Sequence, residues 1–126
     1  AYAQAGVDAQ VLPFIDDTAA AMSAADLIVC RAGASTVTEI AAVGAAAVFV
    51  PFPFAVDDHQ THNARFLVDQ GGGWLIPQNQ LTPSLLAEML QKTERSTLVS
   101  QGLEAKKLQK IGATDMVVAA CEEVCA

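Results

Sequence analysis

Short apolar runs alternate with longer stretches of helical spacing along most of this chain. Apolar runs that predict strands lie at residues 11–15, 27–30, 47–50 and 74–76. The run at 47–50 has no polar position, as expected for a strand that is covered on both faces. Because strands and helices alternate at spacings that suit crossover connections, the pattern predicts an α/β fold, a parallel sheet with flanking helices.

The helical stretches carry start and stop signals. Asp16 or Asp17 can cap the first helix, and Gly44 suits a left-handed cap at the end of the second. Thr82 followed by Pro83 is a strong helix start, because the first helical position has no use for the amide that proline lacks. We expect helices from Asp16 or Asp17 to about Ala25, from about Ser35 to Val43, from Asp57 or Asp58 to about Gln70, from Pro83 to about Lys92, from about Ser96 to Lys110 and from about Thr114 to Val124.

Composition and charge narrow the classes of partner. A length of 126 residues with 52% apolar side chains suits a single domain with a substantial core. The net charge of -7 and the pI near 4.5 argue against nucleic acid and against an anionic membrane surface. The 3 cysteines are odd in number, and Cys121 and Cys125 lie on one predicted helix in poor disulfide geometry. We therefore expect a reducing, cytoplasmic environment.

The beginning of the chain and its most apolar window bear on membrane association. Residues 1–9 have no helix-cap signal, so we expect the sequence to begin inside an element whose beginning is missing. They also lack the basic cluster and the apolar core of a signal peptide. The uncharged window 40–56 is interrupted by Gly44, Pro51 and Pro53 and is shorter than a span of about 20 residues. We expect a single partial domain over residues 1–126 that does not cross a membrane.

The stretch from Cys30 to Ile40 is the strongest candidate for a binding site. It follows an apolar strand and precedes a helix, so it predicts a tight turn into a helix N-terminus. The first amides of a helix have no partner within the helix, and the helix dipole adds positive potential there. Gly33 lets a ligand approach the backbone closely, although it equally serves a left-handed turn. The junction therefore predicts a binding site for an anion such as a phosphate.

Thr36 and Glu39 have two interpretations. Their spacing is that of a capping box, in which the Thr36 side chain caps the helix and Glu39 reaches back to its amide. Spacing alone favours this interpretation, because capping boxes are common at helix starts. In the alternative, the amides of Ala34, Ser35 and Thr36 hold a phosphate while Glu39, about one turn further on, accepts hydrogen bonds from ligand hydroxyls.

The predicted topology brings several loops to one place. Ligands of parallel α/β sheets lie beyond the carboxyl ends of the strands. The loops that leave those ends follow Ile15, run from Arg31 to Ser35, and run from Pro51 to Asp58. We therefore expect one cleft with these residues near it: Phe14, Ile15, Arg31 to Thr36, Glu39 and Asp58 to Asn63.

For the charged and histidine side chains near this cleft, the sequence indicates a ligand-binding or metal-binding role only weakly. Arg31 can neutralise a phosphate or pair with Asp26, and surface pairing is the default for a single arginine. His59 and His62, beside two aspartates, have the spacing of metal ligands. Without an Asp-x-Asp motif or a third well-spaced ligand, a polar helix start is the better interpretation. We expect no metal and no cofactor.

The loop phenylalanines and the cysteines have structural interpretations. Phe52 and Phe54 either line an apolar pocket or cover the core, which is the commoner role of such residues. Cys30 reads as an inert, buried strand residue. We expect Cys121 and Cys125 to pack against neighbouring residues on the last helix, without a redox or metal role.

Several of these segments, in this order, resemble the MurG family. The matching runs are Phe14 to Asp16, Cys30 to Ala42, Phe49 to Pro53 and Asp58 to Ala64, and the likeness covers nearly the whole chain from Val11 onward. Members of the family are bacterial glycosyltransferases that move N-acetylglucosamine from UDP-N-acetylglucosamine onto undecaprenyl-diphospho-muramoyl-pentapeptide (lipid I), which completes lipid II for peptidoglycan. The resemblance implies a GT-B architecture of two Rossmann-like halves that face a cleft, with this chain as most of the C-terminal, donor-binding half.

The resemblance also implies roles for single residues, with no catalytic residue in this chain. The family's positions supply a uracil pocket, a carboxylate at the ribose, amides at the diphosphate and polar side chains at the sugar. In this chain the uracil pocket matches Phe14 and Ile15, and the ribose carboxylate matches Glu39. The diphosphate amides match Ala34, Ser35 and Thr36, and the sugar-facing side chains match His59 and Gln60, with Asn63 nearby. From their own chemistry we also expect Gly33 and Arg31 at this site.

The chain departs from the family pattern in two ways. Ala45-Ala46 stands where the family usually has a bulkier residue followed by proline, which softens a turn. The acceptor-binding N-terminal half, which would receive lipid I, and the first strand of the donor half are absent. We therefore expect the fragment to be inactive by itself, and the full-length enzyme to lie on the cytoplasmic face of the bacterial inner membrane. The alternative is a non-catalytic, soluble UDP-sugar-binding subunit that docks on a separate membrane-bound partner.

Overall fold

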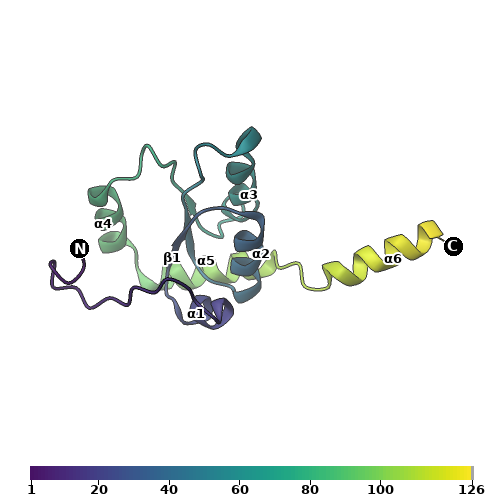
Figure 1. The fold of residues 1–126 in the computed structure, drawn as a ribbon, viewed down its shortest axis with the longest axis horizontal. Helices are drawn as coiled ribbons and strands as arrows, with labels where there is room; N and C mark the ends of the chain where they lie inside the picture. The colour runs from purple at the N-terminus through teal and green to yellow at the C-terminus, as the bar shows by residue number, and fades with distance from the viewer. Residues whose placement is uncertain (126) are drawn as a thin grey trace.

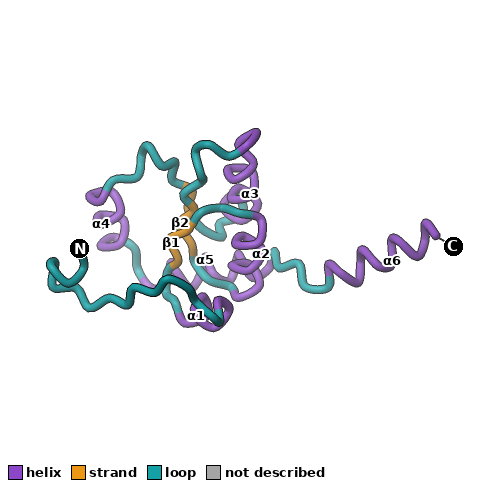
Figure 2. The backbone as a smooth tube through the Cα atoms, in the orientation of Figure 1, coloured by secondary structure: helices purple, strands orange, loops and turns teal. Residues whose placement is uncertain are grey.

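The computed structural model describes residues 1–125, which are built around a parallel sheet (Figure 2). Phe49 is paired with Cys30 on one side and with Leu75 on the other, so the strands end at the same edge of the sheet. The α/β fold predicted from the sequence is confirmed. The strands, which lie in the spatial order β1-β2-β3, are β1 (Ile28–Cys30), β2 (Ala47–Phe49) and β3 (Trp74–Leu75).

The helices lie where the helical spacing predicts them, with ends that differ by a few residues at most. Over the described part of the chain they are α1 (Thr18–Ala24), α2 (Ala34–Val43), the short 3-10 helix η1 (Val56–Asp58), α3 (His59–Val68), α4 (Pro83–Lys92), α5 (Arg95–Lys107) and α6 (Ala113–Cys125).

Three predicted helix caps are present. The Asp17 carboxylate accepts a hydrogen bond from the Ala20 amide at 2.9 Å at the start of α1. The Thr82 hydroxyl accepts one from the Leu85 amide at 3.1 Å at the start of α4. Gly44 ends α2 with φ 74° and ψ 45°, a left-handed conformation that costs little without a side chain.

The core fixes α2 and α3 against the sheet. Its large, fully buried side chains include Phe49 of β2, Ile40 of α2 and Leu67 of α3. Burying each such side chain contributes about 1.5–3 kcal/mol. α2 packs against α3, and α3 against β3. Because α2 follows β1 and α3 follows β2, both helices begin on the side of the sheet where the strands end.

The contact between α2 and α5 depends on small residues. Gly102 of α5 lies so close to the end of α2 that a Cβ atom there would be 2.3 Å from the Gly44 carbonyl oxygen. The Lys106 ammonium donates to the Ala42 carbonyl, so a cation lies at the negative end of α2. Ala45 is buried beside this contact.

The strand predicted at residues 11–15 is wrong. No strand is assigned before β1 in the described chain, and every side chain of residues 1–20 is exposed. A strand needs a partner for its backbone groups, and the sheet here begins at β1. The apolar run therefore has no neighbouring strand with which to pair.

α6 extends away from the sheet, with the C-terminus at its far end (Figure 1). Every described side chain of this helix is exposed, including Cys121 and Cys125. The interpretation of these cysteines as packing residues is therefore wrong in this structure, because no neighbouring element covers them. Among the described residues, no helix is both long enough and apolar enough to span a membrane.

Candidate functional site

α2 begins directly after the loop that leaves β1. Gly33 is its cap residue, with φ -63° and ψ 149°, and no described side chain caps the helix start. The Val37 amide donates to the Gly33 carbonyl at 3.0 Å, which opens the helix. The amides of Ala34, Ser35 and Thr36 precede this bond and have no acceptor within the helix. The carboxyl edge of the sheet thus presents free donors at a positive helix end.

The capping-box interpretation of Thr36 and Glu39 is wrong. α2 begins at Ala34, so Thr36 lies inside the first turn and cannot be the cap. The reason is that Gly33 already adopts the extended cap conformation ahead of it. Glu39 is exposed in the second turn. The alternative, in which Glu39 accepts hydrogen bonds from a ligand, stays a prediction.

Arg31 binds the backbone at the end of β2. Its Nη1 atom donates to the carbonyls of Val50 at 3.2 Å and of Pro51 at 3.3 Å. The alternative pairing of Arg31 with Asp26 is wrong, since Asp26 forms an ion pair with Arg95 at 2.7 Å. Arg31 therefore links the loop after β1 to the end of β2.

Gln60 and Asn63, from the first turns of α3, bind the loop that precedes α2. The Gln60 Oε1 atom accepts hydrogen bonds from the Ala32 amide at 3.2 Å and from the Phe52 amide at 2.9 Å. The Asn63 Nδ2 atom donates to the Ala32 carbonyl at 3.0 Å. The structure thus brings the loops after β1 and β2 together with the start of α3.

The two histidines of α3 bind the backbone of the preceding turn. The Nδ1 atom of His59 lies 2.7 Å from the Val56 carbonyl oxygen, and that of His62 lies 3.1 Å from the Asp58 carbonyl oxygen. A carbonyl only accepts, so each Nδ1 atom donates, which leaves Nε2 as the acceptor of the neutral ring. Among residues 1–125, no group of three or more His, Cys, Asp and Glu side chains could hold a metal ion.

The turn before α3 has an unusual backbone. Asp57 and Asp58 adopt left-handed conformations with φ 52° and 53°, which non-glycine residues rarely do. Asp58 occupies the predicted cap position of α3, but its carboxylate accepts from the Thr61 hydroxyl at 2.6 Å rather than from a helix amide. Such conformations cluster at functional sites and are maintained by surrounding contacts.

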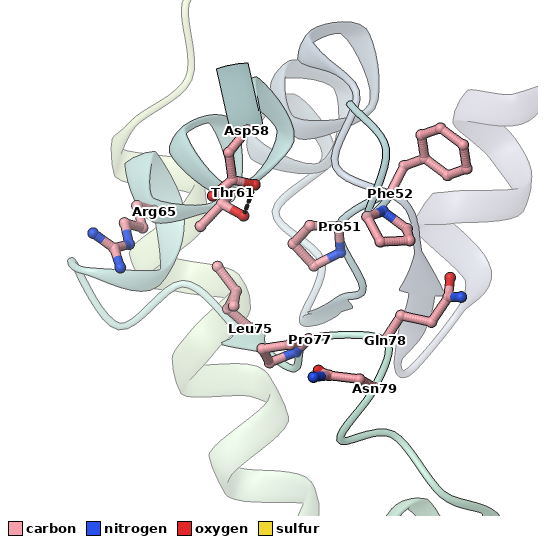
Figure 3. Close-up of a pocket in the computed structure, with 10 residues that line it drawn as sticks. Pro51, Phe52, Asp58, Thr61, Arg65, Leu75, Pro77, Gln78 and Asn79 are labelled. Carbon is pink, nitrogen blue, oxygen red and sulfur yellow. Dashed lines mark hydrogen bonds between the residues drawn. The ribbon is translucent and has the colours of Figure 1, made fainter. Parts of the chain in front are cut away.

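A cavity of about 530 Å³ lies between α3 and the loops that follow β2 and β3 (Figure 3). Its wall combines polar side chains of η1 and α3 (Asp58, Thr61 and Arg65) with apolar side chains and with the amides of Gln78 and Asn79. Sequence reasoning missed the residues after β3, although the rule of strand-end loops applies to them equally. The lining residues are Pro51, Phe52, Pro53, Asp58, Thr61, Arg65, Leu75, Pro77, Gln78 and Asn79.

The loop phenylalanines do not cover the core. Phe52 lines the cavity of Figure 3, and its ring lies 5.7 Å from the Arg31 guanidinium, within cation–π range. Phe54 is 82% exposed and contacts the Phe52 ring edge to face, with 5.7 Å between centroids. Of the two interpretations, the structure supports a pocket wall for Phe52 and neither for Phe54.

Phe14 and Ile15 lie apart from these loops in the contacts that the structure shows. Phe14 is 75% exposed, and Ile15 lines an apolar cavity of about 270 Å³ with residues of α1 and with Leu27 and Ile28. Ile28 is the first residue of β1, at the end of the strand opposite to the loops. Their expected role at a uracil ring stays a prediction.

Cys30 ends β1 beside the candidate site. Its side chain is half-buried, and this burial raises the pKa of the thiol from 9.0 to about 11. The thiol is therefore neutral at pH 7 and a poor nucleophile, because the thiolate is the reactive form. The interpretation of Cys30 as an inert strand residue agrees with this environment.

The chain resembles known proteins over almost its whole length. A sequence model described as the glycosyltransferase family 28 C-terminal domain matches residues 2–120. The UDP-N-acetylglucosamine--N-acetylmuramyl-(pentapeptide) pyrophosphoryl-undecaprenol N-acetylglucosamine transferase of Albidiferax ferrireducens is 75% identical over 98% of this chain, and that of Polaromonas naphthalenivorans is 70% identical over 98%. The chain spans 32% and 34% of their respective lengths.

A solved structure supports the same relationship. The crystal structure of Acinetobacter baumannii MurG superimposes with a TM-score of 0.85 and 49% sequence identity, over 90% of this chain and 33% of that one. The fold is thus that of the C-terminal half of a GT-B glycosyltransferase. The chain belongs to glycosyltransferase family 28 and corresponds to the C-terminal domain of its MurG members.

Proposed function

We propose that the chain is the donor-binding part of an inverting glycosyltransferase. The reaction is the transfer of N-acetylglucosamine from UDP-N-acetylglucosamine to undecaprenyl-diphospho-muramoyl-pentapeptide in peptidoglycan synthesis. The observation that carries the proposal is the uncapped start of α2, with a glycine at its cap and the exposed Glu39 one turn further on. The names of the closely similar relatives support the choice of sugar and acceptor.

The uncapped amides suit the chemistry of the leaving group. As the bond between the sugar and the β-phosphate oxygen breaks, negative charge grows on the phosphate of UDP. The amides of Ala34, Ser35 and Thr36 are already oriented by α2 and oppose this charge without reorganising. The helix dipole alone contributes about 0.3–2 kcal/mol. Arg31 adds a full positive charge beside the same loop.

The remaining roles rest on the positions that match the MurG family rather than on contacts within the structure. Glu39 accepts hydrogen bonds from the ribose hydroxyls, Phe14 and Ile15 hold the uracil, and His59, Gln60 and Asn63 face the sugar. The acceptor lipid binds the other half of the enzyme, which lies on the cytoplasmic face of the inner membrane. The chain spans about a third of its relatives' length, so it supplies the donor site and not the complete reaction.

Calorimetry with UDP, UDP-N-acetylglucosamine and ADP tests this proposal, repeated on Glu39→Ala. We expect UDP to bind more tightly than ADP, and Glu39→Ala to weaken UDP binding by about 10- to 100-fold, because a hydrogen bond to a charged group contributes about 1.5–3 kcal/mol.

Glu123→Ala is the matched control, since Glu123 is an exposed carboxylate on α6, away from the loops (Figure 1). It should leave UDP affinity unchanged. Equal affinities for ADP and UDP, or equal effects of the two substitutions, would refute the donor-site assignment.

A further inference from the structure

Ala32 has a backbone that neither the sheet nor a helix satisfies. It lies between β1 and α2, and its side chain is fully buried. The last backbone bond of the adjoining strands runs from the Val50 amide to the Cys30 carbonyl at 2.8 Å. Buried backbone groups must find partners, so both polar groups of Ala32 depend on side chains. Those side chains are Gln60 and Asn63, which we call the amide clamp.

The chemistry of the partners fixes how each clamp residue is oriented. Two amide N–H groups approach the Gln60 side chain, and only its oxygen can accept them. Both lone-pair positions of Oε1 are then occupied, and the Nε2 group remains free to donate. Asn63 uses its Nδ2 group on the Ala32 carbonyl, which leaves Oδ1 free to accept. The clamp therefore binds the loop with one end of each amide and keeps the other end available.

The clamp connects the start of α2 to a well-anchored helix. Gln60 and Asn63 lie one turn apart on the same face of α3. α3 is anchored in the core by the fully buried Leu67. Ala32 directly precedes Gly33, the cap of α2, so a shift of the cap must break hydrogen bonds of the clamp. The second bond of Gln60, to the Phe52 amide, extends the same restraint to the loop after β2.

We propose that Gln60 is a positioning residue, which with Asn63 fixes the anion-binding start of α2 through the Ala32 backbone. The proposal deepens the donor-site function and rests on it for the identity of the anion. It predicts that loss of the Gln60 acceptor weakens the binding of a nucleoside diphosphate that carries no sugar. A side chain that only contacted the sugar would have no such effect.

The first test measures amide hydrogen exchange by NMR in the ligand-free chain. Gln60→Met keeps the size of the side chain and removes the amide oxygen, so the Ala32 and Phe52 amides should exchange about 3- to 10-fold faster. Gln60→Glu keeps an oxygen that accepts both bonds and should preserve their protection. The resonances of the Ala34, Ser35 and Thr36 amides should move in the Met variant. Unchanged exchange in the Met variant, or loss of protection in the Glu variant, would overturn the proposal.

The second test compares two ligands by calorimetry. We expect Gln60→Met to weaken UDP binding by a factor of about 10 and UDP-N-acetylglucosamine binding by at least that factor, because a displaced loop affects the diphosphate in both ligands. Gln91→Met, the same substitution at an exposed position of α4, should change neither affinity. A loss confined to UDP-N-acetylglucosamine would contradict positioning and indicate sugar contact alone.

The two tests separate failure of the clamp from failure of the donor site. If the unsubstituted chain does not bind UDP but the exchange pattern follows the expected order, the clamp stands and the proposed function fails. If UDP binds and is sensitive to Glu39→Ala but not to Gln60→Met, the function stands and the positioning role is refuted.

Discussion

Ala32 illustrates, at the residue scale, which contacts a sequence reveals and which it conceals. The spacing of Gln60 and Asn63 places them on one helix face, and the polar character of this segment is evident in the sequence. Their partner lies 28 residues away from Gln60, and nothing local indicates that contact. Thr36 shows the opposite case, in which a local pattern predicts a contact that does not form. Thr36 and Glu39 have the spacing of a capping box, but Gly33 is the cap residue of α2. Residue roles that depend on tertiary partners could not be predicted from local patterns.

The Cys30 thiol should make the stability of the fold depend on pH. Its pKa is raised from 9.0 in the ordinary thiol to about 11 by burial. Below pH 9 the thiol is protonated in both the folded and the unfolded chain. Its full contribution to the free energy of unfolding is therefore present. As the pH rises further, the unfolded chain loses the proton first, and stability falls until the folded thiol also ionises. We expect a loss on the order of 1 kcal/mol, reduced by solvent screening of a half-exposed group.

Urea denaturation across this pH range measures the effect, with Cys30→Ala as the comparison. The free energy of unfolding of the unsubstituted chain should fall more steeply with pH than that of Cys30→Ala. Cys121→Ala, at an exposed position on α6, should follow the unsubstituted chain. Parallel curves for Cys30→Ala and the unsubstituted chain would contradict the raised pKa.

At the scale of elements, caps and apolar runs predicted most of the fold. Thr82-Pro83, Asp17 and Gly44 mark helix ends that the structure reproduces, because capping depends on the residues of the helix itself. Packing between helices was not predictable in the same way. Gly102 interrupts a helical stretch without a local reason, and its role is evident only beside the end of α2.

Gly102→Ala tests that contact. A Cβ atom would lie 2.3 Å from the Gly44 carbonyl oxygen, so α5 must move away from α2. We expect a destabilisation of about 1–3 kcal/mol, typical of overpacking, despite the better helix propensity of alanine. Chemical denaturation measures it. Ser100→Ala, on an exposed position of the same helix, should be neutral or slightly stabilising, and equal stability of both variants would refute the packing constraint.

At the scale of the whole molecule, the sheet has an open side. β1 lies at its edge, and Val29 in that strand is 48% exposed. The apolar run at residues 11–15 predicted a strand because periodicity reports which residues suit a sheet, not whether a neighbouring strand is present. The family relationship, a parallel sheet and the convergence of two loops at its carboxyl edge were all accessible from the sequence. The separate position of Phe14 and Ile15 was not.

The most direct test follows the backbone amides of the chain by NMR while UDP is added. The proposed donor site predicts that the Ala34, Ser35 and Thr36 amides shift progressively and saturate with one dissociation constant, and that Glu39→Ala weakens this constant. The amide resonances of Leu75 and Asn79, which line the cavity of Figure 3, should shift less. Saturable UDP binding that leaves the first amides of α2 unmoved, with shifts confined to that cavity, would contradict the assignment of α2 as the diphosphate site.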